Sequence, residues 1–526
     1  MDDRDVRDEK FVLVVDLGTG GPKVGLVSLL GRVVHQEHHE VETHYTPDGG
    51  ATQDAEEWWQ VIAAATRAAV ASGVVDAAQI VAVSITGQWA STVPVDEAGL
   101  PVGPVIMWMD SRGGELVRQR MGGPVSGYKA RGIAEFIRRS GGAPSLDGAD
   151  PIGHRLFLQH HEPDLWRRSR WLLEPVDYLS MRFSGKAAAS PVSMTGSWLV
   201  DTRNPASISY DPLLVDLAGG GVEKLPPLQK FGSVIGPIQP AVADDLGLGH
   251  HVQVVTGAPD LHTAAIGSGA VRLGEAHMAV STTGWISVPI ARKKTDIIRN
   301  VATVPGIDDA TYLVANNHET AGMCLQWLRS VLNGGLAGAG TDAGELDYDR
   351  LNELAAASAP GSGDVIFTPW LKGERSPVAD RTMRAGFHNM SLATTQGDLI
   401  RSVLEGVAYN NQWLHEAVEK FVGGRLDNIR FIGGGAQSDL WCQIHADVMD
   451  RTIEQVADPL YCGLRGAALS AAMTLGEVRQ DELRGLVKIA KSFSPDPANR
   501  EVYDRLYAEF PGLYGSQKKF FRRLNK

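Results

Sequence analysis

A glycine-rich turn near the amino terminus carries the residue types that bind a nucleotide phosphate. Asp16 follows the apolar run FVLVV and opens DLGTGGPK, which ends at Lys23. Glycines can expose their backbone N–H groups, as a phosphate cradle requires. Thr19 and Lys23 could contact phosphate oxygens, and Asp16 could hold Mg²⁺ directly or through water. A capped glycine hairpin is the alternative, and the Walker spacing is absent. The predicted cofactor-binding residues are Asp16, Gly18, Thr19, Gly20 and Lys23.

Two further turns have the composition of phosphate or nucleotide sites. STTG at 281–284 lies between two apolar segments, and its hydroxyl groups and glycine suit a small phosphate turn, although a plain β-turn looks the same. GGGAQS at 433–438 follows an apolar strand and opens a helix, so a nucleotide could approach its backbone closely. The predicted nucleotide-binding residues here are Thr282, Thr283, Gly284, Gly434, Gly435, Ala436 and Ser438.

A single carboxylate stands out in the middle of the chain. Asp260 ends the sequence GAPD, which follows an apolar strand at 252–257 and precedes a small-residue helix at 262–270. A carboxylate at such a strand-to-helix turn is expected in a cleft rather than in a core. Its alternative role is a helix N-cap, which would commit part of the side chain.

The elements that would position these residues fall into two halves, each with strands before helices. Three strands precede the first helix, which does not match the βαβ start of a dinucleotide-binding fold and opposes a nicotinamide oxidoreductase. The glycine-rich stretch 333–345 is predicted to be a surface loop. In the first half, strands are predicted at 11–16, 22–30, 32–43 and 80–86, with a helix at 55–72. In the second half, we predict a strand pair at 277–290, helices at 396–421 and 463–476, and a strand, turn and helix at 427–451.

Composition restricts the partners. A chain of 526 residues is too long for one hydrophobic core. Its net charge of −12 disfavours nucleic acid and anionic lipid as partners. The apolar runs are strand-length, and the first residues lack the order of a signal peptide, so we expect a cytoplasmic protein without a membrane span. Cys324, Cys442 and Cys462 lie far apart, and we predict buried thiols rather than a disulfide or zinc set.

Six motifs in one order resemble a known family. Each motif is moderately specific, and six in order are highly specific. The chain is similar to the FGGY family of carbohydrate kinases, closest to its xylulokinase branch, over about residues 11–480. The motifs are DLGTGGPK at 16–23, WMDSR at 108–112, GAPD at 257–260, TTG at 282–284, KGERSP at 372–377 and GGGAQSDLW at 433–441.

The resemblance implies a fold, cofactors and roles. It implies two actin/hexokinase-like (ribonuclease-H-like) α/β domains with ATP and Mg²⁺ in the cleft between them. Asp260 matches the catalytic base that takes the proton from a sugar hydroxyl, and Asp16 and Asp260 become the metal ligands. The partner is a small sugar or polyol, and a homodimer is the candidate assembly. The implied division is a sugar-binding domain at 1–256, a nucleotide-binding domain at 257–480 and a helical tail at 481–526.

Departures from the family pattern concern the acceptor. GQWAS at 87–91 stands where xylulokinase-like members carry Gly-Gln-Met-His-Gly. We predict that Gln88, Trp89 and Asp260 contact the acceptor and that Trp89 stacks on a sugar or polyol face, with a core-filling Trp as the alternative. D-Xylulose is then expected to be a poor acceptor. An ATP-dependent sugar kinase is the leading hypothesis, and a non-catalytic nucleotide- or sugar-binding regulator on the same fold is its rival.

Overall fold

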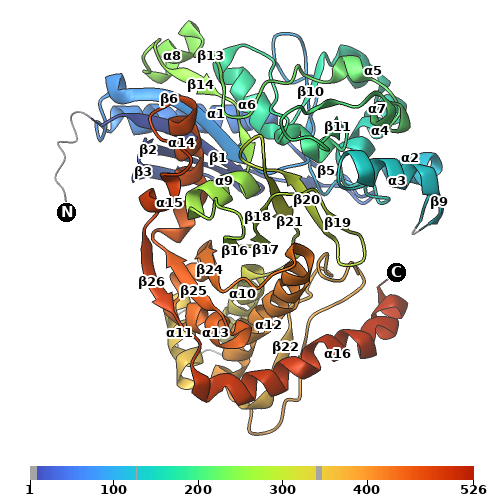
Figure 1. The fold of residues 1–526 in the computed structure, drawn as a ribbon, viewed down its shortest axis with the longest axis vertical. Coiled ribbons are helices and arrows are strands. Elements are labelled where there is room, and N and C mark those ends of the chain that lie inside the picture. The colour runs from blue at the N-terminus through green and yellow to red at the C-terminus, as the bar shows by residue number, and fades with distance from the viewer. Residues whose placement is uncertain (1–8, 126, 339–345, 526) are drawn as a thin grey trace.

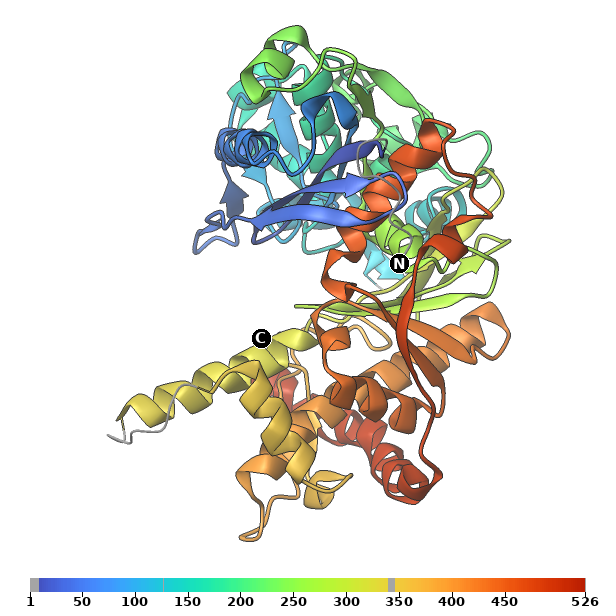
Figure 2. The ribbon, with the colours of Figure 1, turned by 90° about the vertical axis from the view of Figure 1, so that its left-hand side faces the viewer.

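Two α/β lobes make up the part of the chain that this computed structural model describes, residues 9–125, 127–338 and 346–525. The lobe built mainly from the amino-terminal half lies above the other in Figure 1, and Figure 2 shows the same two-part shape from the side. The carboxyl-terminal helix α16 (Arg500–Leu524) runs along the lower lobe.

The upper lobe is organised around a mixed sheet in the order β13-β14-β6-β1-β2-β3. Its strands are β1 (Phe11–Gly18), β2 (Gly21–Ser28), β3 (Val33–His38), β6 (Ile80–Gly87), β13 (Val234–Pro237) and β14 (Gln253–Val255), and its covering helices include α1 (Ala55–Ala71), α9 (Asp260–Ser268) and α14 (Cys462–Thr474). On central β1, Leu13 packs in one hydrophobic cluster with Trp58 of α1, whereas Val14 packs in another with Leu464 of α14. Both faces of β1 are therefore buried, which explains its continuous apolar run.

The lower lobe contains a five-stranded sheet in the order β17-β16-β24-β25-β26. Its elements include β16 (Ala276–Val280), β17 (Gly284–Ser287), β24 (Asn428–Ile432), β25 (Thr452–Val456), β26 (Ile489–Phe493), α12 (Gln396–Val422) and α13 (Asp439–Met449). The long helix α12 begins with a capping box, in which Thr395 and Asp398 each accept the other's backbone N–H, and ends at Gly423 in the left-handed region.

Two regions join the lobes. The first is the hydrophobic cluster around α9 and α14, which contains Val14 of the upper sheet together with Ala279 of β16 and Ile432 of β24 in the lower sheet. A second contact runs through a four-stranded sheet, in which Tyr312 donates a hydrogen bond of 3.0 Å to the carbonyl of Thr202 in the upper lobe. This sheet has the order β18-β21-β20-β19, with strands β18 (Pro289–Ile290), β19 (Thr295–Asp296), β20 (Val301–Pro305) and β21 (Tyr312–Ala315).

The expected elements are confirmed, with one exception. The predicted strands and helices around the glycine turns all occur. The surface-loop prediction for 333–345 is wrong for its first part, because helix α10 (Gly322–Gly338) continues through it, and residues 339–345 lie outside the described ranges. The Asn333 side chain holds this end of the helix by two hydrogen bonds with the backbone of Leu346. The domain boundaries stay predictions.

Two further findings concern the cysteines and the possibility of a membrane-spanning helix. All three thiols are buried and free, as predicted. Among the described helices, none combines the length and the apolar character needed to cross a membrane.

Candidate active site

Three strand ends of the upper sheet bring the main predicted residues to one edge. β6 pairs in parallel with β1, where Thr86 lies opposite Asp16, and with β15 (Ala258–Pro259), where Gly87 lies opposite Pro259. Because parallel strands end at the same edge, Asp16, Gln88 and Asp260 follow one another across it.

Asp16 and Lys23 face each other across the first hairpin. They are register partners on β1 and β2, and Lys23 Nζ lies 3.4 Å from Asp16 Oδ2. The pKa of Lys23 is raised, chiefly by the charge of Asp16 and further by that of Asp260. A cation between two carboxylates therefore stays protonated and available to phosphate oxygens.

Asp260 is the first residue of α9 and keeps part of its surface exposed. Its Oδ1 accepts the backbone N–H of Leu261 at 2.7 Å, the one hydrogen bond found for this carboxylate within the described ranges. Burial raises its pKa to about 7, and the nearby charge of Asp16 adds to the shift. The N-cap of α9 is Pro259, without a side-chain cap, so capping does not occupy the Asp260 carboxylate. This carboxyl group has the properties of a general base poised near neutral pH.

The turn between β1 and β2 is open on one side. A Cβ added at Gly20 would meet nothing within 4 Å, so a ligand could approach its backbone, whereas Gly21 has φ +135° and a Cβ there would lie 2.0 Å from the His39 carbonyl oxygen. The Thr19 hydroxyl oxygen accepts a hydrogen bond of 3.0 Å from Trp108 Nε1. Its hydroxyl hydrogen remains available to a phosphate oxygen. Gly18 lies beside Gly21 at the end of the hairpin.

The two predicted turns of the lower lobe lie side by side. A Cβ at Gly433 would lie 2.6 Å from Ser281 Oγ, while Gly434 has open space apart from a distant Leu460 side chain. Among the hydroxyl residues of the first turn, Thr282 is exposed and Thr283 is half-buried. Gly284 is buried at the start of β17. These turns could therefore receive a ligand through Thr282, Thr283 and the backbone of Gly434.

The other predicted residues of the second turn are engaged within the protein. Gly435 and Ala436 are buried, and the Ala436 carbonyl accepts a hydrogen bond of 2.7 Å from Gln455. Ser438 caps α13 by accepting the N–H of Trp441 at 3.2 Å, and its hydroxyl donates to Asn352 at 2.8 Å. Ala436 and Ser438 thus shape the turn and could contact a nucleotide only through atoms that these hydrogen bonds leave free.

A short connection links this turn to Asp16. The N–H of Gly433 donates to the carbonyl of Pro459 at 3.1 Å. A few residues later, at the start of α14, a Cβ added at Gly463 would lie 3.0 Å from Asp16 Oδ2. The chain therefore runs from the lower glycine turn to the carboxylate of the upper one, as a nucleotide site shared by both lobes requires.

The predicted acceptor loop follows β6 at the same edge. Gln88 is buried, its Oε1 accepts the Ser91 hydroxyl at 3.2 Å, and its amide nitrogen has no partner in the described structure. Trp89 is half-buried, and its Nε1 donates to the carbonyl of Ser193 at 2.6 Å. Its ring meets His262 edge-on, with 6.0 Å between centroids. The hydrogen bond to Ser193 and the contact with His262 therefore fix the Trp89 ring, and part of the ring remains exposed.

Two of the six family motifs, WMDSR and KGERSP, have no role assigned from the sequence. They contact each other at this edge of the sheet. The Arg375 guanidinium of KGERSP lies 5.0 Å from the ring centre of Trp108 in WMDSR, and its Nε lies 2.5 Å from Glu319 Oε1. Sequence reasoning missed this contact because the two motifs are far apart in the chain. Their shared place in the six-motif order was the only available signal.

The donor set fits a magnesium ion carried by a nucleotide. No group of three or more histidine, cysteine or acidic side chains that could hold a metal occurs in the described part of the chain. Asp16 and Asp260 offer two carboxylates at one edge, and Mg²⁺ commonly takes one or two carboxylates and fills its shell with water and phosphate oxygens.

The comparisons with known proteins decide the family. The model of the FGGY family of carbohydrate kinases, N-terminal domain, matches residues 11–267, and that of its C-terminal domain matches residues 277–475. The chain belongs to the FGGY family of carbohydrate kinases. The membership confirms the predicted two-domain fold and an ATP-dependent sugar kinase, and it opposes the regulator and oxidoreductase alternatives.

The relatives of this FGGY kinase differ in their named acceptors. A xylulose kinase of Staphylococcus epidermidis is 27% identical over 97% of this chain and 98% of its own. An L-xylulose/3-keto-L-gulonate kinase of Escherichia coli is 26% identical over 98% and 99%. A gluconate kinase structure from Lactobacillus acidophilus superposes with a TM-score of 0.84 at 22% identity, covering 98% of this chain and all of that one, which supports the fold.

Proposed function

We propose that this kinase transfers the γ-phosphoryl group of ATP to a hydroxyl of a pentulose-like sugar or a polyol. Asp260 takes the proton of the acceptor hydroxyl, whose oxygen attacks the γ-phosphorus while ADP leaves. The observation that carries this assignment is the carboxylate of Asp260, which is partly exposed, bonded only by its neighbour's N–H within the described ranges, and has a pKa of about 7. A group so poised can act as base at neutral pH.

The remaining predicted residues divide between donor and acceptor. Lys23, the backbone of Gly18 and Gly20, and the Thr19 hydroxyl receive phosphate oxygens, and the lower turns at 281–284 and 433–438 receive the rest of the nucleotide. Asp16 and Asp260 would hold Mg²⁺, which would supply positive charge to neutralise the transferred phosphoryl group. Closure of the two lobes would exclude water as a competing acceptor.

The acceptor is a sugar or polyol other than D-xylulose. Loop 88–91 supports this assignment, because the partly exposed Trp89 ring contacts His262, two residues after the base, and no histidine stands at Ala90. An apolar wall discriminates between acceptors less than a polar partner does, so we expect a site tolerant of several related sugars. We also propose a cytoplasmic homodimer with domains at 1–256 and 257–480 and a helical tail at 481–526.

A screen of ADP release tests the proposal. Purified protein with Mg·ATP is offered D-xylulose, L-xylulose, D-gluconate, aldopentoses and polyols, with Asp260→Asn as the matched inactive control. We expect at least one acceptor to be turned over by the unmodified protein and not by the variant, and D-xylulose to rank below it. Equal turnover by both proteins, or D-xylulose as the best acceptor, contradicts the respective part.

A further inference from the structure

Two buried carboxyl groups at the start of helix α6 (Pro175–Ser184) are hydrogen-bonded to the acceptor loop 88–91, one directly and one through Ser193. We propose that Glu174 and Asp177 are positioning residues of phosphoryl transfer, which fix loop 88–91 and the turn 257–260 in one arrangement. The inference rests on the proposed function, since it assigns these two segments to the acceptor and the base.

Glu174 holds the backbone of the loop. Its Oε2 accepts the N–H of Ala90 at 2.9 Å. Ala90 has φ +63°, a left-handed conformation that a residue with a Cβ adopts only where its surroundings impose it. Glu174 is buried, and burial raises its pKa well above the ordinary range. The carboxyl group thus stabilises a backbone conformation that the loop sequence alone disfavours.

Asp177 holds the side chain of the same loop through Ser193. The Ser193 hydroxyl donates to Asp177 Oδ2 at 2.7 Å, and the Ser193 carbonyl accepts Trp89 Nε1 at 2.6 Å. Trp89 and Ala90 are therefore tied to two carboxyl groups that begin one helix. A shift of either carboxyl group would move the partly exposed Trp89 ring.

The same network reaches the base-bearing turn. The N–H of Ser193 donates to the Ser190 hydroxyl at 3.0 Å, and that hydroxyl donates to the carbonyl of Gly257 at 3.1 Å. Gly257 opens the sequence GAPD, which ends at Asp260. One connected set of buried hydrogen bonds consequently sets the placement of Trp89 relative to Asp260.

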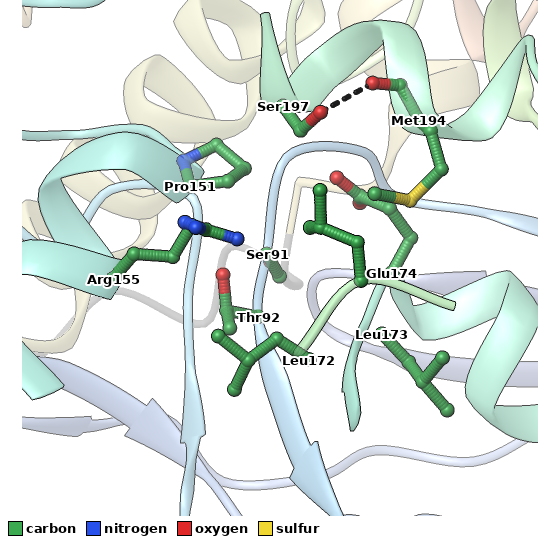
Figure 3. Close-up of a pocket in the computed structure, with 10 residues that line it drawn as sticks. Ser91, Thr92, Pro151, Arg155, Leu172, Leu173, Glu174, Met194 and Ser197 are labelled. Atoms are coloured by element: carbon green, nitrogen blue, oxygen red, sulfur yellow. Dashed lines mark hydrogen bonds between the residues drawn. The ribbon is translucent and has the colours of Figure 1, made fainter. Parts of the chain in front are cut away.

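The space behind the loop leaves it little room to move. A small cavity of about 10 Å³, with room for no more than about one water, is lined by Glu174, Ser91 and Arg155 (Figure 3). Arg155 is buried, and its Nε and Nη1 have no partner in the described structure. Removing the Glu174 side chain would enlarge this cavity, and the loop could then retreat from the acceptor.

Misplacement of this kind affects catalysis more than binding of ATP. A displacement of about 1 Å at a reacting group can lower the rate on the order of 10²-fold, even when the mutated residue lies away from the chemistry. The phosphate-binding residues of the first hairpin belong to β1 and β2 and do not touch Glu174 or Asp177 through any hydrogen bond in the described structure. A positioning role therefore predicts an effect confined to the acceptor side.

The test compares Glu174→Ala with Glu174→Gln and with the matched control Asp211→Ala. Asp211 is a buried carboxylate of the same lobe that also accepts backbone N–H groups, those of Leu213 and Leu214, but lies outside the network. Kinetics use Mg·ATP with the acceptor of the screen, whether D-xylulose, L-xylulose, D-gluconate, an aldopentose or a polyol, that has the highest kcat/KM in the unmodified protein. We expect kcat/KM for that acceptor to fall about 10²-fold in Glu174→Ala, to recover in Glu174→Gln, and to be unchanged in Asp211→Ala, with the KM for ATP unchanged throughout.

Hydrogen exchange of the peptide over 86–92 supplies a readout that needs no acceptor. Exchange should accelerate in Glu174→Ala and not in Asp211→Ala. Unchanged exchange, or an acceptor kcat/KM equal to that of the control at equal thermal stability, overturns the inference while leaving the proposed function intact. If the unmodified protein turns over no acceptor of the screen, the proposed function fails first, and the positioning role falls with it.

Discussion

The carboxylates at the edge of the upper sheet differ from those buried behind it in how many hydrogen bonds their oxygens accept. Asp16 contacts Lys23 at 3.4 Å, and Asp260 accepts one N–H from its own neighbour, with no other hydrogen bond to either carboxylate in the described ranges. Glu174 and Asp177, by contrast, each accept two hydrogen bonds. Glu174 accepts the N–H groups of Ala90 and Ser91, and Asp177 accepts the Ser193 hydroxyl and the Ser190 N–H. Buried polar groups are normally satisfied, so oxygens left unbonded at an edge indicate a ligand.

The pKa values alone do not separate these two sets. Burial raises the pKa of Asp260 to about 7 and that of Asp177 to about 8. Both groups are therefore poised near neutral pH, but only Asp260 is partly exposed with lone pairs to spare. Bonding and exposure, and not the pKa shift, therefore distinguish the carboxyl group that we propose to meet substrate from the one that we propose to position others.

Replacing Asp260 gives the largest expected effect. Asp260→Asn should still fold and bind Mg·ATP, but kcat should fall by roughly 10²–10⁴-fold because the general base is lost. Steady-state ADP release with the best acceptor measures the loss. Asp211→Asn is the matched control, since Asp211 is also a buried carboxylate of this lobe and lies outside the network that positions loop 88–91. If the control loses as much activity as Asp260→Asn, the distinction between edge and buried carboxylates is wrong.

Replacing Asp16 should give the next largest effect. Asp16→Asn removes a carboxylate from the proposed magnesium set, so the Mg²⁺ concentration for half-maximal rate should rise about 10–100-fold, as for the loss of other groups that support a metal. A titration of rate against Mg²⁺ at saturating ATP measures it. Lys23→Met should instead raise the KM for ATP. A normal magnesium titration of Asp16→Asn would reduce this residue to a structural role in the hairpin.

Much of the fold and of the edge could be read from the sequence because local physics determines both. The run FVLVV predicted a strand buried on both faces, and β1 is such a strand. The glycine turns and the GAPD turn were visible because backbone exposure and strand-to-helix turns leave a composition signal. The exception at 333–338 shows its limit, since this glycine-rich stretch continues helix α10 and does not form a loop.

The buried network could not be read from the sequence. EPVD at 174–177 looks like an ordinary helix start, with Pro175 in its first turn. The bond from Glu174 to Ala90 joins residues 84 positions apart, and only tertiary packing brings them together. A carboxyl group whose partners are backbone groups of a distant loop leaves no spacing pattern to detect.

Replacing Trp89 tests whether this side chain contacts the acceptor. Trp89→Ala should raise the acceptor KM by about tenfold, because one wall of an apolar pocket is worth ~1–3 kcal/mol, and should leave the KM for ATP unchanged. Trp413→Ala, which removes a half-buried indole of α12 that packs against α16, is the control and should alter stability alone. A Trp89→Ala variant that shifts only nucleotide affinity would place this side chain on the donor side.

The last prediction concerns the dependence of stability on pH and tests the buried carboxyl groups directly. The pKa of Asp177 rises from its ordinary value of 3.8 to about 8 on folding, mainly through burial. Between these values the folded state holds a proton that the unfolded state has lost, so the free energy of unfolding should fall as pH rises through this window.

Asp177→Asn lacks this titration, and urea unfolding between pH 5 and 9 should show a shallower decline than in the unmodified protein. Ser193→Ala supplies the opposite test. The Ser193 hydroxyl lowers the pKa of Asp177 by its hydrogen bond, so its removal should raise that pKa and extend the decline to higher pH. If Asp177→Asn follows the unmodified protein at every pH, Asp177 is ionised in the folded state. The buried carboxyl groups would then resemble those at the edge in charge and differ from them only in their bonding.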